Sequence, residues 1–178
     1  VSGRSVYQIA EQPIFKARAA RLNDRRGDLT LLINGMPLIH IELKRSGVPV
    51  SQACNQIEKY AHEGVFTGLF SLVQIFVSME PVETVYFANP GKGGDFSLYR
   101  FHWADFNNEP INEWQRVIAT LLFIPMAHQL IGFYSVADER DATLKVMRSY
   151  QYYAAAAISD RVRRASWDKR GARGGYIW

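Results

Sequence analysis

The fold of this chain is decided by one stretch of sequence, Gly27-Asp28-Leu29-Thr30-Leu31-Leu32-Ile33-Asn34-Gly35-Met36-Pro37-Leu38-Ile39-His40-Ile41-Glu42-Leu43-Lys44. Residues 29–33 and 38–43 are rich in branched apolar side chains, which predicts two β-strands. The Asn34-Gly35 pair between them is a strong signal for a hairpin turn. The charged residues of the stretch therefore lie on or beside strands that are otherwise apolar.

Side-chain alternation places the charges of the second strand on one face. Glu42 and Lys44 are two positions apart, so their side chains point the same way, together with those of Leu38 and His40. One interpretation is a half-exposed hairpin whose polar face is simply hydrated. The other is a functional site that holds a carboxylate and a lysine side by side.

The turn decides whether the first acid reaches that face. In an antiparallel hairpin the residue numbers of every directly paired couple have the same sum. Asp28 lies on the same face as Glu42 only if this sum is even. A two-residue turn that closes Ile33 against Met36 is then excluded, and a three-residue turn or a bulge at Gly35 is expected. The two acids would lie roughly 5 to 8 Å apart at Cβ. That separation suits one divalent ion between two carboxylates.

The order of these charges resembles a known nuclease motif. Asp28 followed by Glu42-Leu43-Lys44 is similar to the D…(D/E)-x-K signature of the restriction-endonuclease-like nucleases. More closely, the chain resembles the N-terminal nuclease domain of the restriction (motor) subunit of type I restriction-modification enzymes. The blocks that carry this resemblance are LLINGMPL at 31–38, IELKR at 41–45, NQIEKY at 55–60, FHWADFN at 101–107 and RSYQYYA at 148–154.

The resemblance implies a fold and an active site. The fold is an α/β restriction-endonuclease-like domain, with a central mixed β-sheet flanked by helices. The catalytic residues are Asp28, Glu42 and Lys44, and Mg²⁺ is held by Asp28, Glu42 and the backbone carbonyl of Leu43. The family commonly has Pro before the first acid, whereas this chain has Gly27, which is expected to hold Asp28 less rigidly.

Phosphodiester hydrolysis explains why these residue types are needed. The reaction requires a positioned water and an offset for the charge that grows on the phosphate. Mg²⁺ keeps several waters and prefers oxygen ligands, so two carboxylates and one carbonyl are sufficient protein ligands, and histidines are not needed. Lys44 is expected to orient or help activate the water and to offset the phosphate charge.

A helix is predicted after the Gly47-Val48-Pro49 break, from Ser51 as N-cap to about His62. Gln56 and Tyr60 are four residues apart and project from neighbouring turns. A hydrogen-bonded tyrosine at a helix edge is one interpretation. The Gln56-x-x-x-Tyr60 pattern also resembles the Q-x-x-x-Y motif of RecB-type nucleases, which implies that both side chains lie beside the catalytic acid and lysine and help to place DNA.

Further elements are expected along the rest of the chain. Apolar runs predict strands over residues 69–79, 84–88 and 96–103, followed by a helix that begins at Asn108 or Glu109 and continues to about 122. Trp103 and Trp114 are expected in the core, since aromatic residues at these spacings usually are. A short element follows at 126–134, and a long helix is expected from Thr143.

Two domains are predicted, an endonuclease domain over 1–124 and a linker with the start of an ATP-dependent motor domain over 125–178. Arg148-Ser149-Tyr150-Gln151 resembles the Q motif of superfamily 2 helicases, which implies that Gln151 and Arg148 contact the adenine of ATP in the full-length subunit. A glutamine at a packing edge of the helix is the alternative. No Walker A loop follows, so this chain alone is expected not to hydrolyse ATP through that site.

Composition is that of a globular protein. The 178 residues are 48% hydrophobic and 21% charged, and no run of about 18 uncharged apolar residues or signal-peptide pattern occurs. We therefore expect a cytoplasmic protein with no membrane contact. The single cysteine, Cys54, excludes an internal disulfide and is expected in the core.

The net charge of +4 and pI of about 9.3 fit a nucleic-acid partner. The basic residues form two clusters. The first borders the proposed metal site and is expected to contact phosphates, whereas the second fits a solvated face. The first cluster is Lys16, Arg18, Arg21, Arg25 and Arg26, and the second is Arg161, Arg163, Arg164, Lys169, Arg170 and Arg173.

The resemblance implies a Mg²⁺-dependent DNA endonuclease that makes no sequence-specific contacts of its own and is coupled to ATP-driven DNA translocation. Double-stranded DNA and the methyltransferase and specificity subunits of the restriction complex are the implied partners. Two alternatives remain. One is a RecB-like repair nuclease, and the other is a catalytically silent docking and coupling module.

Overall fold

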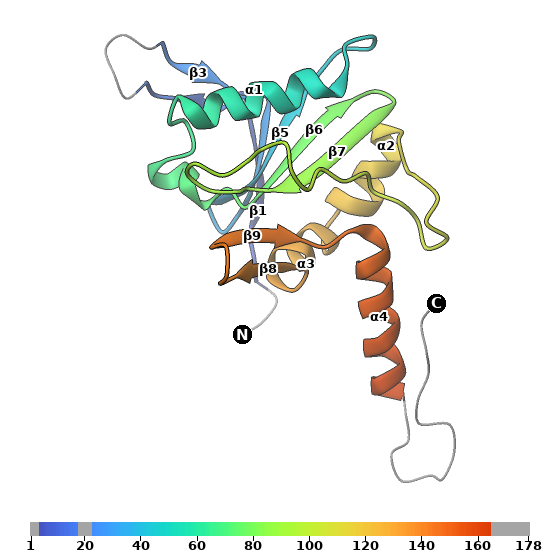
Figure 1. Ribbon diagram of the computed structural model, residues 1–178. Helices are drawn as coiled ribbons and strands as arrows, with labels where there is room; N and C mark the ends of the chain where they lie inside the picture. Colours follow the sequence, from blue (N-terminus) through green and yellow to red (C-terminus); the bar gives the residue numbers. More distant parts are fainter. Residues whose placement is uncertain (1–3, 18–22, 165–178) are drawn as a thin grey trace.

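The centre of the molecule is a five-stranded mixed β-sheet (Figure 1). The computed structural model describes residues 4–17 and 23–164. The strands of the sheet lie in the order β1 (Tyr7–Glu11), β4 (Leu29–Ile33), β5 (Met36–Leu43), β6 (Ile75–Glu80) and β7 (Glu83–Ala88). Strands β5 and β6 are parallel and all other neighbours are antiparallel. The predicted α/β class with a mixed central sheet is therefore confirmed.

The hairpin of β4 and β5 is present, but its turn differs from the prediction. Ile33 pairs with Met36, so the turn has two residues, and the exclusion of this turn was wrong. Asn34 and Gly35 have φ of 53° and 78°, the positive values that a type I′ turn requires at both central positions. The bulge predicted at Gly35 lies instead at Leu38, inside β5: Leu31 pairs with Ile39 and Leu32 with Pro37, so Leu38 is the extra residue.

This bulge decides on which face of the sheet the side chains at the start of β4 lie. Beyond it Thr30 faces His40, and the same register continued by two residues sets Asp28 opposite Glu42. Without the extra residue, every side chain at the start of β4 would point to the other face. The bulge in β5, rather than the turn, therefore brings the two acids to one face.

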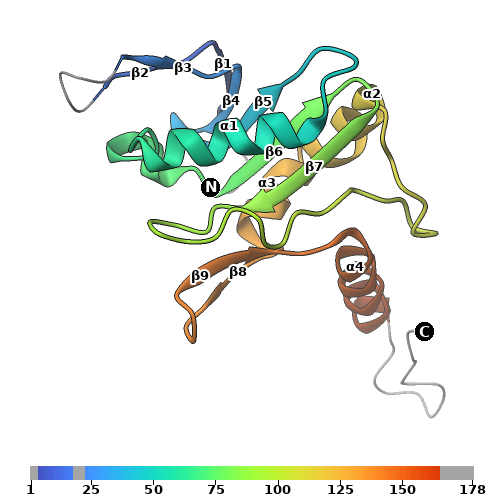
Figure 2. The same cartoon turned by 45° about the horizontal axis from the view of Figure 1, so that its top comes forward.

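Helix α1 (Val50–His62) crosses this face of the sheet (Figures 1 and 2). The helix connects β5 to β6, as a parallel strand pair requires. It begins one residue before the predicted N-cap Ser51, with Pro49 at the N-cap and no capping side chain. Its buried side chains form a stripe that includes Cys54, which lies in the core as predicted. The stripe packs against an apolar cluster that contains Val73, Phe76, Val85, Phe87 and Phe96.

Short helices cover the opposite face. These are α2 (Trp114–Val117), the π-helical turn η2 (Ile118–Leu122) and α3 (Met126–Gly132). Met126, Ala127 and Leu130 share one apolar core with Ile39, Val77 and Tyr86 of the sheet. The proposed division at 124/125 stays a prediction.

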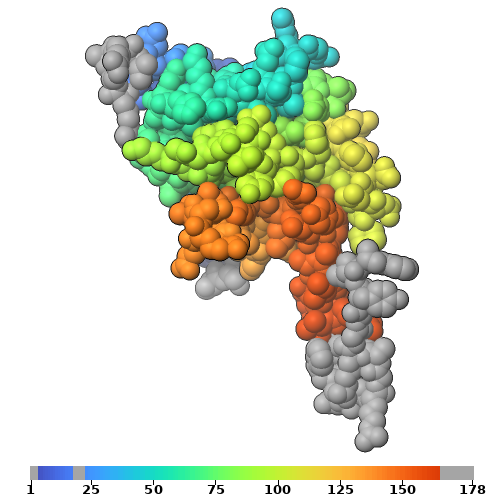
Figure 3. Space-filling model, in the orientation of Figure 1, coloured from blue at the N-terminus to red at the C-terminus, as the bar shows by residue number. Residues whose placement is uncertain are grey.

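The segment between β7 and α2 differs from its prediction. No strand forms over 96–103. Only isolated bridges join Tyr86 to Phe101 and Ala104 to Pro110, and the helix begins at Trp114 rather than near 109. Trp103 is buried as predicted, but Trp114 is 42% exposed. In Figure 3 this segment is the yellow-green band between α1 and the C-terminal elements. The start of the predicted strand over 69–79 is the 3₁₀ helix η1 (Gly68–Leu72).

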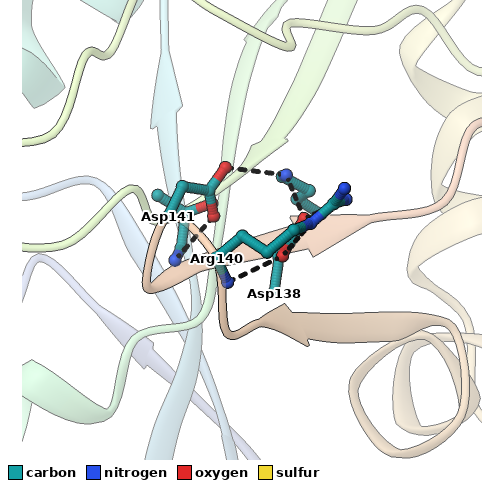
Figure 4. Close-up of polar contacts among 5 residues, drawn as sticks. Asp138, Arg140 and Asp141 are labelled. Carbon is teal, nitrogen blue, oxygen red and sulfur yellow. Dashed lines mark hydrogen bonds and ion pairs between the residues drawn. The ribbon is translucent and has the colours of Figure 1, made fainter.

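A second hairpin occupies the place where a long helix was predicted to begin. It consists of β8 (Ser135–Asp138) and β9 (Thr143–Val146), and helix α4 (Ser149–Arg164) follows it. Lys145 bridges Asp138 and Asp141 at 2.7 and 2.8 Å, which ties the hairpin end together (Figure 4). The helix begins at Ser149, so the prediction that it begins at Thr143 was wrong. Helix α4 projects from the body of the molecule (Figures 1 and 2).

Two short strands, β2 (Ile14–Phe15) and β3 (Arg25–Arg26), form a small separate ladder before β4. Among the described residues no helix is long and apolar enough to cross a membrane.

Candidate active site

One amide side chain joins the predicted catalytic residues to helix α1. The Gln56 Nε2 donates to Glu42 Oε2 at 2.8 Å and to the Tyr60 hydroxyl at 2.8 Å. The Gln56 Oε1 accepts a hydrogen bond from Lys44 Nζ at 2.6 Å. Both donors and the acceptor of the amide are thus used. The structure therefore brings Glu42, Lys44, Gln56 and Tyr60 into one network.

Asp28 reaches the site from the residue before β4. Its Oδ2 accepts a hydrogen bond from the backbone N–H of Leu43 at 2.7 Å. Its own carbonyl accepts from Gln12 N–H at 2.8 Å, and the preceding Gly27 donates its N–H to Pro13 at 3.1 Å. The backbone around Asp28 is therefore fixed by hydrogen bonds on both sides.

Glu42 is buried completely, at 0% exposure. Burial raises the pKa of its carboxyl group, because the charged form loses its hydration; His40 opposes this rise, and the nearby charge of Asp28 adds to it. Asp28 lies at the same end of the hairpin, because its Oδ2 accepts a hydrogen bond from the backbone N–H of Leu43, the residue after Glu42. A cation between the two carboxylates would relieve both the repulsion and the burial cost.

His40 is the residue of the site that the sequence analysis did not assign. It is buried at 0% exposure, its Nε2 lies 3.0 Å from Glu42 Oε1, and its Nδ1 lies 3.3 Å from the Thr30 hydroxyl. The strand alternation places it on the face of Glu42, and that was the available signal.

Tyr60 anchors the network to the backbone. Its hydroxyl donates to the carbonyl of Arg26 at 3.0 Å while it accepts from Gln56. Burial raises the pKa of the Tyr60 phenol, and the negative charge of Glu42 raises it further. The hydroxyl therefore stays protonated and holds Gln56 in place.

A polar cleft of about 480 Å³ adjoins Gln56 and Tyr60, and its other lining residues are Arg25, Gln52, Asn55 and Lys59. Arg25 forms a two-point ion pair with Glu63, in which Nη2 lies 2.7 Å from Oε1. Lys16 pairs with Asp24 at 2.8 Å, and Arg26 donates to Gln12. Of the first basic cluster, Arg18 and Arg21 lie outside the described residues. The phosphate contacts of this cluster stay a prediction.

Gln151 has a local partner at the start of α4. Its Oε1 accepts the backbone N–H of Arg148 at 2.9 Å, while the Arg148 carbonyl accepts from Tyr152 N–H at 3.0 Å. This is the reciprocal half of a capping box. Gln151 is exposed rather than part of a buried stripe, and Ile158 and Val162 are exposed as well.

The Arg148 guanidinium lies over the ring of Phe101, 4.6 Å from its centroid. The adenine contacts implied for Arg148 and Gln151 stay a prediction. Of the second basic cluster, Arg161, Arg163 and Arg164 lie in the last turn of α4, and its other members lie outside the described residues.

Among the described residues no three His, Cys, Asp or Glu side chains gather as a metal site. The predicted ligand set has only two carboxylates and a backbone carbonyl, and it stays a prediction. Hard oxygen donors of this kind fit Mg²⁺ better than a transition metal.

The sheet and its carboxylate–lysine network define an α/β protein with an acidic site at the end of a mixed sheet. The family described as "Type I restriction enzyme R protein N terminus" matches residues 2–94, more than half of the chain. The chain therefore belongs to this family, and the resemblance to the restriction subunit is confirmed.

Named relatives agree with this assignment. The chain is 33% identical over 174 residues to the "Type I restriction enzyme SauCOLORF180P endonuclease subunit" of Staphylococcus aureus (strain COL), which is 96% of this chain and 17% of the relative. It is 35% identical over 171 residues to the SsaAORF53P endonuclease subunit of Staphylococcus saprophyticus, and this alignment again covers 96% of this chain and 17% of the relative. It is 33% identical over 178 residues to the EcoprrI endonuclease subunit of Escherichia coli, and this alignment covers 98% of this chain and 56% of the relative. The chain thus spans only part of each relative.

Proposed function

We propose that this chain is the nuclease domain of a type I restriction subunit, a Mg²⁺-dependent DNA endonuclease with a restriction-endonuclease-like fold. One observation carries the proposal. The Gln56 amide contacts the Glu42 carboxylate and the Lys44 ammonium at once, at 2.8 and 2.6 Å. Glu42 and Lys44 belong to the end of β5 and the Gln-x-x-x-Tyr pattern belongs to α1, so this contact joins the two motifs that carry the nuclease resemblance.

The ligand set supports Mg²⁺. The Asp28 carboxylate lies on the Leu43 side of the site through its 2.7 Å hydrogen bond. In an antiparallel ladder the N–H and C=O groups of one residue point to the same neighbouring strand, so the Leu43 carbonyl is on the Asp28 side as well. Glu42 supplies a second carboxylate. When bound, Mg²⁺ supplies Lewis-acid polarisation and a water of lowered pKa.

The protein's own residues account for the remaining requirements. Glu42 is held by hydrogen bonds to both carboxylate oxygens, so its position is fixed before substrate arrives. Lys44 is half-buried and held by Gln56, so its charge is available to offset the developing charge on phosphate and to orient the attacking water. Tyr60 maintains this arrangement by holding Gln56.

In the full-length subunit we propose coupling to an ATP-driven motor. The named relatives are endonuclease subunits, of which the staphylococcal examples extend far beyond this chain. Helix α4 would be the first helix of a superfamily 2 helicase-type motor domain. In the full-length subunit, which contains the rest of this motor domain, Arg148 and Gln151 would contact ATP. Double-stranded DNA is the proposed substrate, and methyltransferase and specificity subunits the proposed partners, the latter supplying sequence choice.

Calorimetric titration with Mg²⁺ and Mn²⁺ tests the proposal without the rest of the complex. We expect the wild-type chain to bind and Asp28→Ala to lose binding. Asp24→Ala is the matched control, because Asp24 is an exposed acid that pairs with Lys16 away from the site, and it should bind like wild type. Absence of binding in the wild type, or equal binding by Asp28→Ala, would contradict the metal site and favour the docking-module alternative.

A further inference from the structure

His40 occupies a place in the molecule that none of the motifs explains. It comes two residues before Glu42 on β5 and lies under the active site rather than facing the solvent. We propose that His40 is a positioning residue that fixes the Glu42 carboxylate for metal binding. This role rests on the function proposed above, because it presumes that Glu42 is a metal ligand.

The hydrogen bonds determine how the imidazole is oriented. An ionised carboxylate only accepts hydrogen bonds, so Nε2 of His40 carries the hydrogen that is donated to Glu42 Oε1 over 3.0 Å. The Nδ1 is then an acceptor, and the Thr30 hydroxyl donates to it over 3.3 Å. Thr30 is also buried, at 1% exposure. This arrangement gives every buried polar group of the triplet a partner, as low-polarity interiors require.

Aromatic rings fix the imidazole from the sides. Its ring centroid lies 5.7 Å from that of Phe15, 5.4 Å from that of Phe66 and 6.3 Å from that of Phe76, with edge-to-face geometry in each case. Phe15 and Phe76 are buried. A close-packed interior of this kind leaves no alternative rotamer without moving neighbours. The donor atom therefore stays at one position relative to β5.

The two carboxylate oxygens of Glu42 accept hydrogen bonds from two different residues. Oε1 accepts from His40 on the same strand, and Oε2 accepts from Gln56 on α1. Each carboxylate oxygen has two lone pairs, so both hydrogen bonds leave capacity for a metal ion. Partners that orient a ligand in this way typically contribute about 10–100-fold in metal affinity. His40 thereby extends the site to a residue that contacts neither metal nor DNA.

Two substitutions separate positioning from packing. His40→Gln keeps an N–H donor near the position of Nε2, whereas His40→Leu fills a similar volume without a donor. By calorimetry we expect wild type and His40→Gln to bind Mn²⁺ with similar affinity, and His40→Leu to bind about 10–100-fold more weakly. Thermal unfolding reports whether each variant is folded under the titration conditions.

The outcomes distinguish this role from the function on which it rests. If wild type binds Mn²⁺ and folded His40→Leu binds equally well, the positioning role is wrong while the nuclease proposal stands. If wild type binds none, the metal site fails and this role fails with it. Nitrogen NMR of the metal-free protein gives an independent check. We expect hydrogen on Nε2 of His40, and hydrogen on Nδ1 alone would overturn the assigned contact.

Discussion

The backbone N–H of Leu43 donates to the Asp28 carboxylate at 2.7 Å, and this contact joins the start of β4 to the end of β5. It exists because the bulge at Leu38 shifts the register of the hairpin by one residue. A hairpin with the same two-residue turn and no bulge would send Asp28 to the opposite face. The geometry of the candidate active site thus depends on a backbone irregularity five residues away from it.

Loss of Glu42 or Lys44 should abolish DNA cleavage by the assembled restriction complex. Glu42→Ala removes a proposed metal ligand, and Lys44→Ala removes the charge held at Gln56, so each should lower the cleavage rate by at least about 10²–10⁴-fold. Complex assembly and DNA association, measured by gel shift, should remain. Arg45→Ala is the control, since Arg45 is the exposed neighbour of Lys44. Retained cleavage in either variant would rule out the assignment.

Gln56→Leu should destabilise the chain as well as impair cleavage. The substitution leaves a buried Glu42 oxygen and the Lys44 ammonium without their shared partner, a loss of about 1–3 kcal/mol for unpaired buried groups. Tyr60→Phe removes one hydroxyl and should cost about 0.5–1.5 kcal/mol. Both are measured by urea unfolding. Gln52→Leu, at an exposed position one turn earlier on α1, should stay within about 0.5 kcal/mol of wild type.

Glu42→Gln should gain stability relative to wild type in the metal-free protein as pH rises. Burial raises the pKa of Glu42 above its ordinary value of 4.5, so the folded chain binds this proton more tightly than the unfolded chain does. The stabilising contribution of the protonated form is complete below 4.5 and is lost as pH rises through the higher pKa of the folded state. Each tenfold difference in proton affinity corresponds to about 1.4 kcal/mol.

The measurement is thermal unfolding in chelator across this range. The difference in melting temperature between Glu42→Gln and wild type should be larger, in favour of the variant, at about pH 8 than at about pH 4.5. A difference that is constant with pH would show that Glu42 titrates as it does in the unfolded chain. Added Mn²⁺ should stabilise wild type and have little effect on the variant.

Much of the sheet and site could be predicted because local patterns decide them. The strand 29–33, the place of the turn at Asn34-Gly35 and the burial of Cys54 on α1 depend on residue types at short spacing, and the structure has each of them, although the turn is the two-residue type that the prediction excluded. Parity required an extra residue, but its predicted place at Gly35 was wrong, because no local signal in the sequence marks Leu38 as the bulge. His40 was visible on the right face, yet its partner Thr30 is known only from the pairing of two strands.

The errors toward the C-terminal end have a different cause. Residues 96–103 carry alternating apolar residues, but only one isolated bridge, from Phe101 to Tyr86 of β7, connects them to the sheet, and no strand forms. The segment 135–146 was predicted as linker and the start of a helix. Its hairpin is held instead by ion pairs of Lys145 with Asp138 and Asp141. Side-chain pairing within the hairpin here overrides the helix propensity of the segment.

Gln151→Ala should loosen the first turn of α4. The variant loses the hydrogen bond from Arg148 N–H to Gln151 Oε1, and the loss of a cap of this type costs about 0.5–2 kcal/mol. Amide exchange at Arg148 should accelerate, while exchange in β5 and β6 stays unchanged. Gln151→Glu keeps the acceptor and should retain protection. Equal exchange in all three proteins would mean that the cap does not form in solution.

Gly27→Ala should be among the most destabilising single-methyl additions in this chain. A Cβ at position 27 would lie 2.5 Å from Cε1 of His40 and 2.9 Å from the ring of Phe15, and the imidazole cannot retreat because aromatic rings surround it. Overpacking of this kind costs about 1–3 kcal/mol. Gly132→Ala is the control, since its added Cβ meets nothing closer than 4.0 Å. In a His40→Ala background the nearest obstacle is gone, so Gly27→Ala should cost clearly less than in wild type; equal costs in the two backgrounds, measured by urea unfolding, would show that His40 is not what requires glycine before Asp28.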